Sequence, residues 1–166
     1  MKTLFVAASV FGALLSTGSS QDWAKARIEK SPRHLEWVKV KNGNREVNCY
    51  VAYPEVKDKA TAVLLIHEIY GLSDWAKSMC DELAEAGYIA IAPDLLSGAA
   101  PNGGGTAEFG SRDAVTRAVG TLPADQVNGD LDAAAAYVTK LPSCNGKLVV
   151  CGFLLGRCEV LQIRSP

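Results

Sequence analysis

Two short stretches of this chain have residue types and spacings that could carry chemistry. The first is H-E-I-Y-G, in which His67 and Glu68 follow the apolar run A-V-L-L-I. The second is L-V-V-C-G-F-L-L-G, a strand-like run that leads into glycines. A buried strand that enters a sharp glycine turn is the layout that presents a catalytic Ser or Cys. Here the positions between Gly152 and Gly156 hold Phe153, Leu154 and Leu155, and none of these side chains can attack a carbonyl.

Other kinds of site find no support in the sequence. The five cysteines (Cys49, Cys80, Cys144, Cys151 and Cys158) are scattered, odd in number and without a C-x-x-C pair, so they fit no disulfide framework and are expected to be small buried hydrophobes. The two histidines, His34 and His67, lie at no zinc-ligand spacing to a cysteine. The G-G-G run at 103–105 is not followed by the G-K-[ST] of a phosphate loop.

Length and charge indicate one ordinary domain in 166 residues, with 17 Lys+Arg against 18 Asp+Glu. This balance gives no electrostatic reason to expect nucleic acid or a membrane surface as a partner. The sequence does not indicate an oligomeric state.

The first residues have the order of a secretory signal peptide. Lys2 precedes an apolar run over 4–15, and small and polar residues follow, with a cut expected near Gln21. A membrane anchor is the alternative, but the run is shorter than the roughly 20 residues that a spanning helix needs. We therefore expect a signal peptide at 1–20, export to the periplasm or the exterior, no stable membrane anchor, and a polar lead-in at 21–34.

The remaining pattern predicts an α/β fold. Strands are expected around 37–41 and at 47–53, joined by a tight turn at Asn42-Gly43-Asn44, and buried strands at 62–66, 88–92 and 148–152. Helices are expected from Ser73 to Gly87 and over 107–119 and 126–141. A strand, a helix and a strand within about thirty residues predict a right-handed crossover in a mostly parallel sheet. The Gly/Pro-rich loop 94–105 falls at the edge where such sheets bind ligands.

Four ordered motifs (A-V-L-L-I-H-E-I-Y-G-L, A-G-Y-I-A-I-A-P-D-L, D-L-D-A-A-A-A-Y-V and V-V-C-G-F) resemble the dienelactone hydrolase family over residues 35–153. The resemblance implies an α/β-hydrolase-type three-layer sandwich, here without its C-terminal strands. It also implies cleavage of small esters or lactones by a cysteine, with a triad His and Asp from later strands and no cofactor or metal.

Carried over by position, the resemblance makes Glu68 the family glutamate that contacts the nucleophile, and Ile69 and Leu155 the backbone donors to the oxyanion. Leu154 takes the place of the nucleophile. The family's substrate-binding arginine falls at about Gly98. Each residue also has a structural alternative: Glu68 as a solvated acid, His67 as a packed strand-end histidine, and Asp94 as a partner of its own turn.

A shift of reading frame would explain Leu154. If Leu154–Pro166 is encoded by suitable permitted codons, dropping one base turns the string into C-W-G-G-A-R-C-S-R-F-A-A and restores G-F-C-W-G-G. We therefore interpret 154–166 as an aberrant tail of a truncated chain, which would leave L-V-V-C-G-F at an exposed sheet edge, fold poorly and lack activity. The alternative is a non-catalytic binding or interaction module that has discarded its chemistry.

Overall fold

A computed structural model of the chain describes residues 22–154 and 157–161, and their regular elements agree with most of the expected pattern. The strands are β1 (Leu35–Asn42), β2 (Arg45–Ala52), β3 (Ala60–Ile66), β4 (Ile89–Pro93), β5 (Cys144–Leu154) and β6 (Arg157–Leu161). The helices are α1 (Asp22–Glu29), α2 (Asp74–Glu85), α3 (Arg112–Gly120) and α4 (Ala124–Thr139), with a 3₁₀ turn at Thr106–Glu108.

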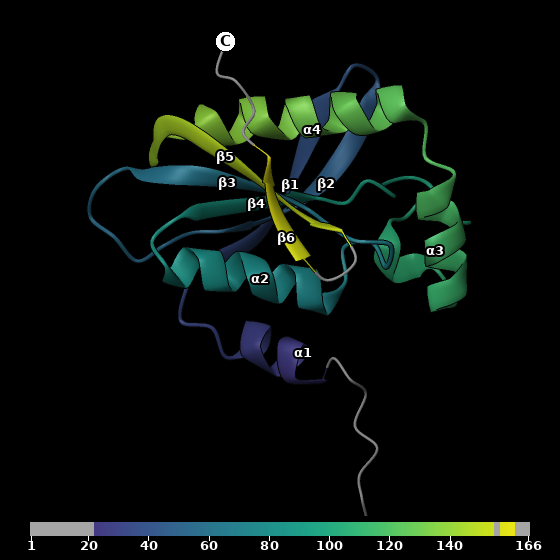
Figure 1. The fold of residues 1–166 in the computed structure, drawn as a ribbon, viewed down its shortest axis with the longest axis horizontal. Coiled ribbons are helices and arrows are strands. Elements are labelled where there is room, and N and C mark those ends of the chain that lie inside the picture. Colours follow the sequence, from purple (N-terminus) through teal and green to yellow (C-terminus); the bar gives the residue numbers. More distant parts are fainter. Residues whose placement is uncertain (1–21, 155–156, 162–166) are drawn as a thin grey trace, which may run out of the picture.

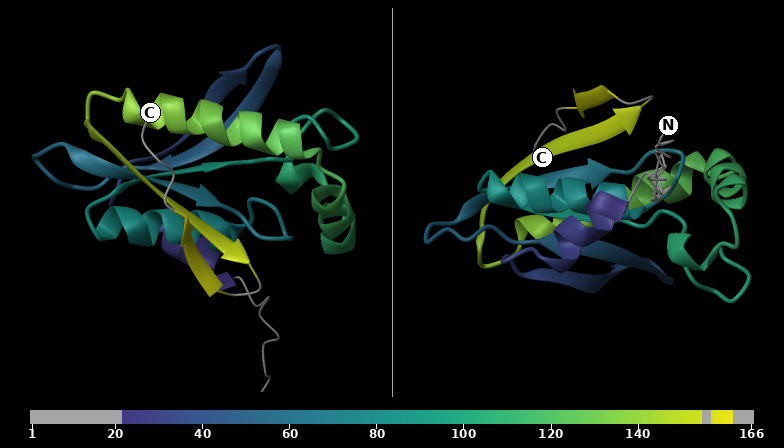
Figure 2. Two further views of the ribbon diagram at one scale, coloured as in Figure 1. Left: turned by 45° about the horizontal axis from the view of Figure 1, so that its top comes forward. Right: turned by 90° about the horizontal axis from the view of Figure 1, so that it is seen from below.

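The strands form one mixed sheet in the order β1-β2-β4-β3-β5-β6. The central strands β4, β3 and β5 are parallel, while β1–β2, β2–β4 and β5–β6 pair in antiparallel fashion. Helix α4 covers one face of the sheet and α2 the other, and α1 lies outside α2 (Figures 1 and 2). This is the α/β sandwich that the sequence predicts, and it brings the carboxyl ends of β3, β4 and β5 to one edge.

Local signals set several of the boundaries. Gly43 has a φ of +58° in the β1–β2 turn, a conformation that glycine adopts without a steric penalty. The Ser73 side chain accepts a hydrogen bond from the Ala76 amide and caps α2. Gly87 ends the same helix at a φ of +93°. These three predictions are confirmed.

Two segments differ from their predicted form. Residues 107–119 do not form one helix: the chain makes the 3₁₀ turn, and α3 begins only after Ser111, whose side chain caps it through the Ala114 amide. The lead-in at 21–34 is not wholly irregular, because Asp22–Glu29 forms α1 and Ala24 within it is fully buried. The polar composition of this segment did not predict a helix, because only one face of α1 packs against the rest of the chain.

The expectation of an exposed β5 edge is wrong for the described residues. Strand β6 pairs with β5 from Val150↔Leu161 to Leu154↔Arg157, so the tail supplies backbone hydrogen-bonding partners to that edge. The open edge strand on this side is therefore β6, a strand of five residues.

The predicted signal peptide lies outside the described residues. None of the helices in the described part of the chain is both long and apolar enough to cross a membrane.

Candidate active site

His67 lies at the end of β3 and joins two loops at the carboxyl edge of the sheet. Its side chain is buried, its Nε2 accepts a hydrogen bond from the Leu95 amide at 3.3 Å, and its Nδ1 lies 2.9 Å from the Glu68 carbonyl oxygen. Since Nε2 accepts, Nδ1 carries the proton and donates to that carbonyl. Both ring nitrogens are thus occupied, as expected of a packed strand-end histidine.

Burial lowers the pKa of His67, against smaller opposing effects of the Glu68 carbonyl and the Asp94 charge. A histidine with a depressed folded pKa binds a proton more readily in the unfolded chain, so its contribution to stability is complete above about pH 6.5 and declines as pH falls below it. We expect the urea midpoint to drop between pH 7.5 and pH 5.5. His67→Gln should remove that drop, and a pH-independent midpoint in the parent chain would contradict the assignment.

The loop after His67 carries the two other residues that the sequence singles out. Glu68 is half-buried, Ile69 is 44% exposed, and the Gly71 amide donates to the Glu68 carbonyl at 3.0 Å to close the turn. The Arg112 guanidinium lies over the Tyr70 ring, with its Cζ 4.1 Å from the ring centroid. Glu68 therefore stands at the strand end without being sequestered, as a residue in contact with substrate or nucleophile would need to be.

Asp94 and Thr106 hold this loop in place. Asp94 Oδ1 accepts from the Leu96 amide at 3.1 Å within its own turn, as expected, and from Thr106 Oγ1 at 2.7 Å. Asp94 Oδ2 accepts from the Thr106 amide at 2.7 Å. Thr106 Oγ1 in turn accepts from the Leu72 amide at 3.0 Å. Nothing in the sequence indicated Thr106, because its partners lie 12 and 34 residues away.

Strands β3 and β5 bring their carboxyl ends together at one edge of the sheet. Their parallel ladder ends with Ile66 opposite Gly152, and Glu68 and Leu154 each follow that pair by two residues in the sequence. The backbone of β5 continues through Leu154 as a strand, in place of a turn into a helix. Leu155, the other expected oxyanion donor, lies outside the described residues.

At the position of the expected substrate arginine, Gly98 has a φ of +78° and is exposed. The nearest cation there comes from β2: Arg45 Nη1 would lie 3.8 Å from a Cβ at Gly98. Its Nε bonds to the buried Asp130 at 3.0 Å, and its Nη2 donates to the Leu95 carbonyl at 3.2 Å. No local signal in the sequence indicates that Arg45 reaches this loop.

No group of three metal-ligating side chains is found among the described residues. Cys49, Cys80 and Cys144 are free and buried, as expected, and burial raises the pKa of Cys49 to about 12. Cys151 is disulfide-bonded, which the scattered cysteine spacing did not predict.

Comparison with known proteins shows to which family the chain belongs. The sequence profile described as "Dienelactone hydrolase family" matches residues 47–165, well over half of the chain. The chain belongs to the dienelactone hydrolase family. The match runs past Phe153 into the tail, beyond the limit that the motifs alone suggested. Family membership supports a hydrolase-type function.

Individual relatives agree with this membership. A Methylorubrum extorquens protein described provisionally as a carboxymethylenebutenolidase is 30% identical over 120 residues, 72% of this chain and 40% of its own length. The carboxymethylenebutenolidase of Pseudomonas putida is 30% identical over 104 residues, 60% of this chain and 43% of its own. A crystal structure of a provisionally assigned dienelactone hydrolase from Klebsiella pneumoniae superposes with a TM-score of 0.61 at 25% identity, covering 73% of this chain and 50% of that one. The chain thus spans about half the length of these relatives.

Proposed function

We propose that this chain is the N-terminal part of a hydrolase of small esters or lactones, and that as written it does not turn substrate over. In the proposed ancestral reaction a cysteine thiolate attacks the carbonyl carbon, the alcohol leaves, and water hydrolyses the thioester. Glu68 would contact the resting thiol, and the Ile69 amide would donate to the oxyanion. This chemistry requires no metal or organic cofactor.

The observation that carries the proposal is the register of β3 and β5. Their ladder ends at Ile66 opposite Gly152, so Glu68 and position 154 each follow its last pair by two residues, and position 154, where the family resemblance expects the nucleophile, holds leucine. A hydrocarbon side chain has no lone pair with which to attack. The slip of reading frame at codon 154 remains our explanation for the leucine.

A second candidate is a non-catalytic binding module of the same fold. The pairing of β6 with β5 favours it, because the tail then completes an edge of the sheet. A module of this kind would fold and bind small molecules without hydrolysing them.

An esterase assay tests the loss of activity. With p-nitrophenyl acetate as substrate, we expect the chain and its Glu68→Ala variant to give the same rate, equal to that of buffer. The three buried free cysteines make an adventitious thiol reaction slow in both proteins. Turnover by folded monomer that exceeds the Glu68→Ala rate by about tenfold or more would overturn the proposal.

We also propose export, which rests on the order of charge, apolar run and small residues over 1–20 alone. Expression in a bacterial host followed by mass spectrometry of the periplasmic fraction should show a mature N-terminus near Gln21. Recovery of only the intact chain, from the cytoplasm or the membrane, would contradict it.

A further inference from the structure

The β1–β2 hairpin presents a polar surface on the side of the sheet that faces α2. Val40 and Val47 pack into the core on the α4 side. Because side chains alternate along a strand, Trp37 and Lys39 of β1 and Glu46 of β2 project from the opposite face. Helix α2 does not extend over this part of the hairpin (Figure 2).

Two hollows adjoin on this surface. One has a volume of about 630 Å³ and is lined by Lys39, Glu46, Asn48 and the loop from Ser97. The other, of about 260 Å³, is lined by Trp37, Lys77 and again Asn48. Asn48 lines both, and the consecutive Gly103 and Gly104 line one each, so the two hollows adjoin along the 97–105 loop. We call them together the hairpin groove.

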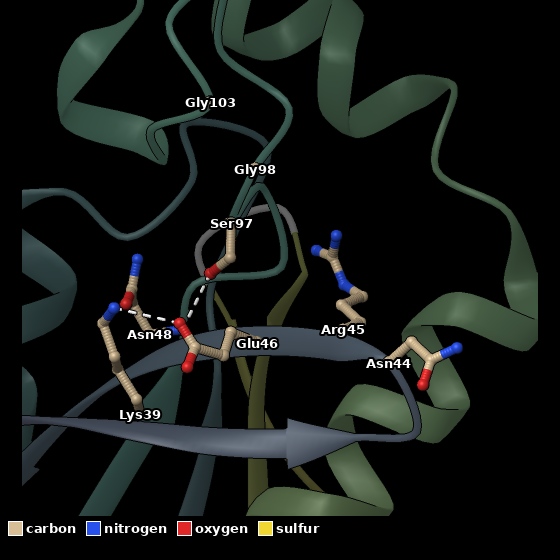
Figure 3. Close-up of a pocket in the computed structure, with 8 residues that line it drawn as sticks. All are labelled: Lys39, Asn44, Arg45, Glu46, Asn48, Ser97, Gly98 and Gly103. Atoms are coloured by element: carbon tan, nitrogen blue, oxygen red, sulfur yellow. Dashed lines mark hydrogen bonds and ion pairs between the residues drawn. The ribbon is translucent and has the colours of Figure 1, made fainter.

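Every cation that lines the hairpin groove is paired with a carboxylate, and two further carboxylates of the lining, Asp94 and Glu108, accept hydrogen bonds from Thr106 and the Gly105 amide. Lys39 Nζ lies 2.9 Å from Glu46 Oε1, and Figure 3 shows these two side chains facing each other beside Asn48. Lys77 Nζ lies 2.7 Å from Asp74 Oδ1, and Arg45 is paired with Asp130. Each cation thus has its own carboxylate, so the groove has no strong preference for an anion. It offers hydrogen-bond donors and acceptors side by side, which suits a ligand whose groups do both.

Trp37 forms an aromatic platform at one end of the groove. Its side chain is 53% exposed, yet it is held by an edge contact with Tyr50 at 5.3 Å and 69° and by Lys77, whose Nζ lies 5.8 Å from the ring centroid. The face of an indole carries partial negative charge and attracts polarised C–H groups. A fixed, exposed ring beside paired donors and acceptors fits a saturated ring that has a C–H face and hydroxyls around its rim.

We propose that the hairpin groove binds a neutral polyhydroxylated ring, a sugar or glycosyl group. Trp37 packs against its C–H face. Its hydroxyls donate to Glu46 and the side-chain oxygen of Asn48 and accept from Lys39 and the side-chain NH₂ of Asn48. This site uses neither Glu68 nor residue 154, so it can operate in the chain as written, and its failure would leave the proposed hydrolase ancestry untouched.

The proposal is tested by titrating the full chain with methyl β-glucoside and with cellobiose. Tryptophan fluorescence and the NMR shifts of the indole N–H groups report binding. We expect saturable binding with a Kd on the order of 1 mM for at least one of these probes. Trp37→Ala should weaken that binding at least tenfold. Trp23→Ala is the matched control, because Trp23 is 51% exposed but lies on α1 outside the groove, and it should leave the Kd unchanged.

Glu46→Gln is a second test of sugar binding in case Trp37→Ala perturbs folding. Glu46 is exposed, so we expect its substitution to leave the fold intact. We expect Glu46→Gln to raise the Kd about threefold or more. Three outcomes would overturn the proposal: no saturable binding of either sugar, equal effects of the two tryptophan substitutions, or tighter binding of succinate or inorganic phosphate than of the sugars.

Discussion

Asp81→Ala should destabilise the chain by about 3–5 kcal/mol, the largest loss we expect from a single substitution. Asp81 is fully buried on α2 and accepts from Arg33 through Nε at 2.8 Å and Nη2 at 2.9 Å. Ser31 Oγ donates to Oδ1, and Arg27 Nε lies 2.9 Å from Oδ2 without hydrogen-bond alignment. Removing the carboxylate leaves the Arg33 guanidinium without its anion and takes from Arg27 one of its partners on α2, so that Glu85 at 2.6 Å is its remaining close one.

The ionisation of Asp81 makes the stability of the fold depend on pH. Burial disfavours the carboxylate, but hydrogen bonds from Arg33 and Ser31 and the charges of Arg33 and Arg27 prevail and hold the pKa of Asp81 below its ordinary value. Its contribution to stability is therefore present above about pH 3.9 and is lost as pH falls through the folded pKa. Asp81→Asn should lose stability at pH 7 and show a shallower acid transition.

Urea unfolding followed by circular dichroism measures both effects of Asp81. Glu29→Ala is the matched control, because Glu29 is likewise an ion-paired carboxylate, on α1, but its contact with Lys25 is 3.9 Å long and exposed, so it should change stability by no more than about 0.5 kcal/mol. Equal losses in Asp81→Ala and Glu29→Ala would show that the buried network does not anchor α1.

Gly71→Val should cost about 2–4 kcal/mol and displace the loop that carries Glu68 and Ile69. Gly71 has a φ of +68°, which disfavours a β-branched side chain, and its Cβ would overlap Thr106 Oγ1 and lie 2.7 Å from Thr106 Cγ2. Thr106 cannot retreat without giving up its hydrogen bonds to Leu72 and Asp94.

Gly43→Val separates the two contributions to this cost. Gly43 has a similar φ of +58°, but no atom lies within 4 Å of its Cβ position, so the substitution should show the backbone strain without the overlap. Amide hydrogen exchange at Leu72 should accelerate in Gly71→Val and stay unchanged in Gly43→Val. Indistinguishable losses of stability in the two variants would contradict the contact with Thr106.

The elements that sequence predicts well are those whose signals are local. The turn at Asn42-Gly43-Asn44, the Ser73 cap and the apolar runs of β3 and β4 each depend on neighbouring residues, and each is found where expected. A turn that begins at Glu68 follows β3 directly, where the apolar run ends. These local signals are enough to predict the central strands and the edge of the sheet at which their carboxyl ends lie.

What sequence could not predict depends on contacts between distant residues. The Asp94–Thr106–Leu72 connection joins three separate loops, and Asp81 binds residues about fifty positions away. Strand β6 pairs with the edge of β5, whose backbone groups would otherwise be unpaired. The residues of the tail have no hydrophobic periodicity that predicts this strand.

The coding DNA through position 154 and the few hundred bases beyond it gives the most direct test of the claim that a hydrolase nucleophile has been replaced by leucine. We expect a one-base shift at this codon to restore Cys-Trp-Gly-Gly and to open a frame with a strand-end Asp and a later His. Leucine codons in a sound frame, with no hydrolase-like sequence downstream, would contradict it.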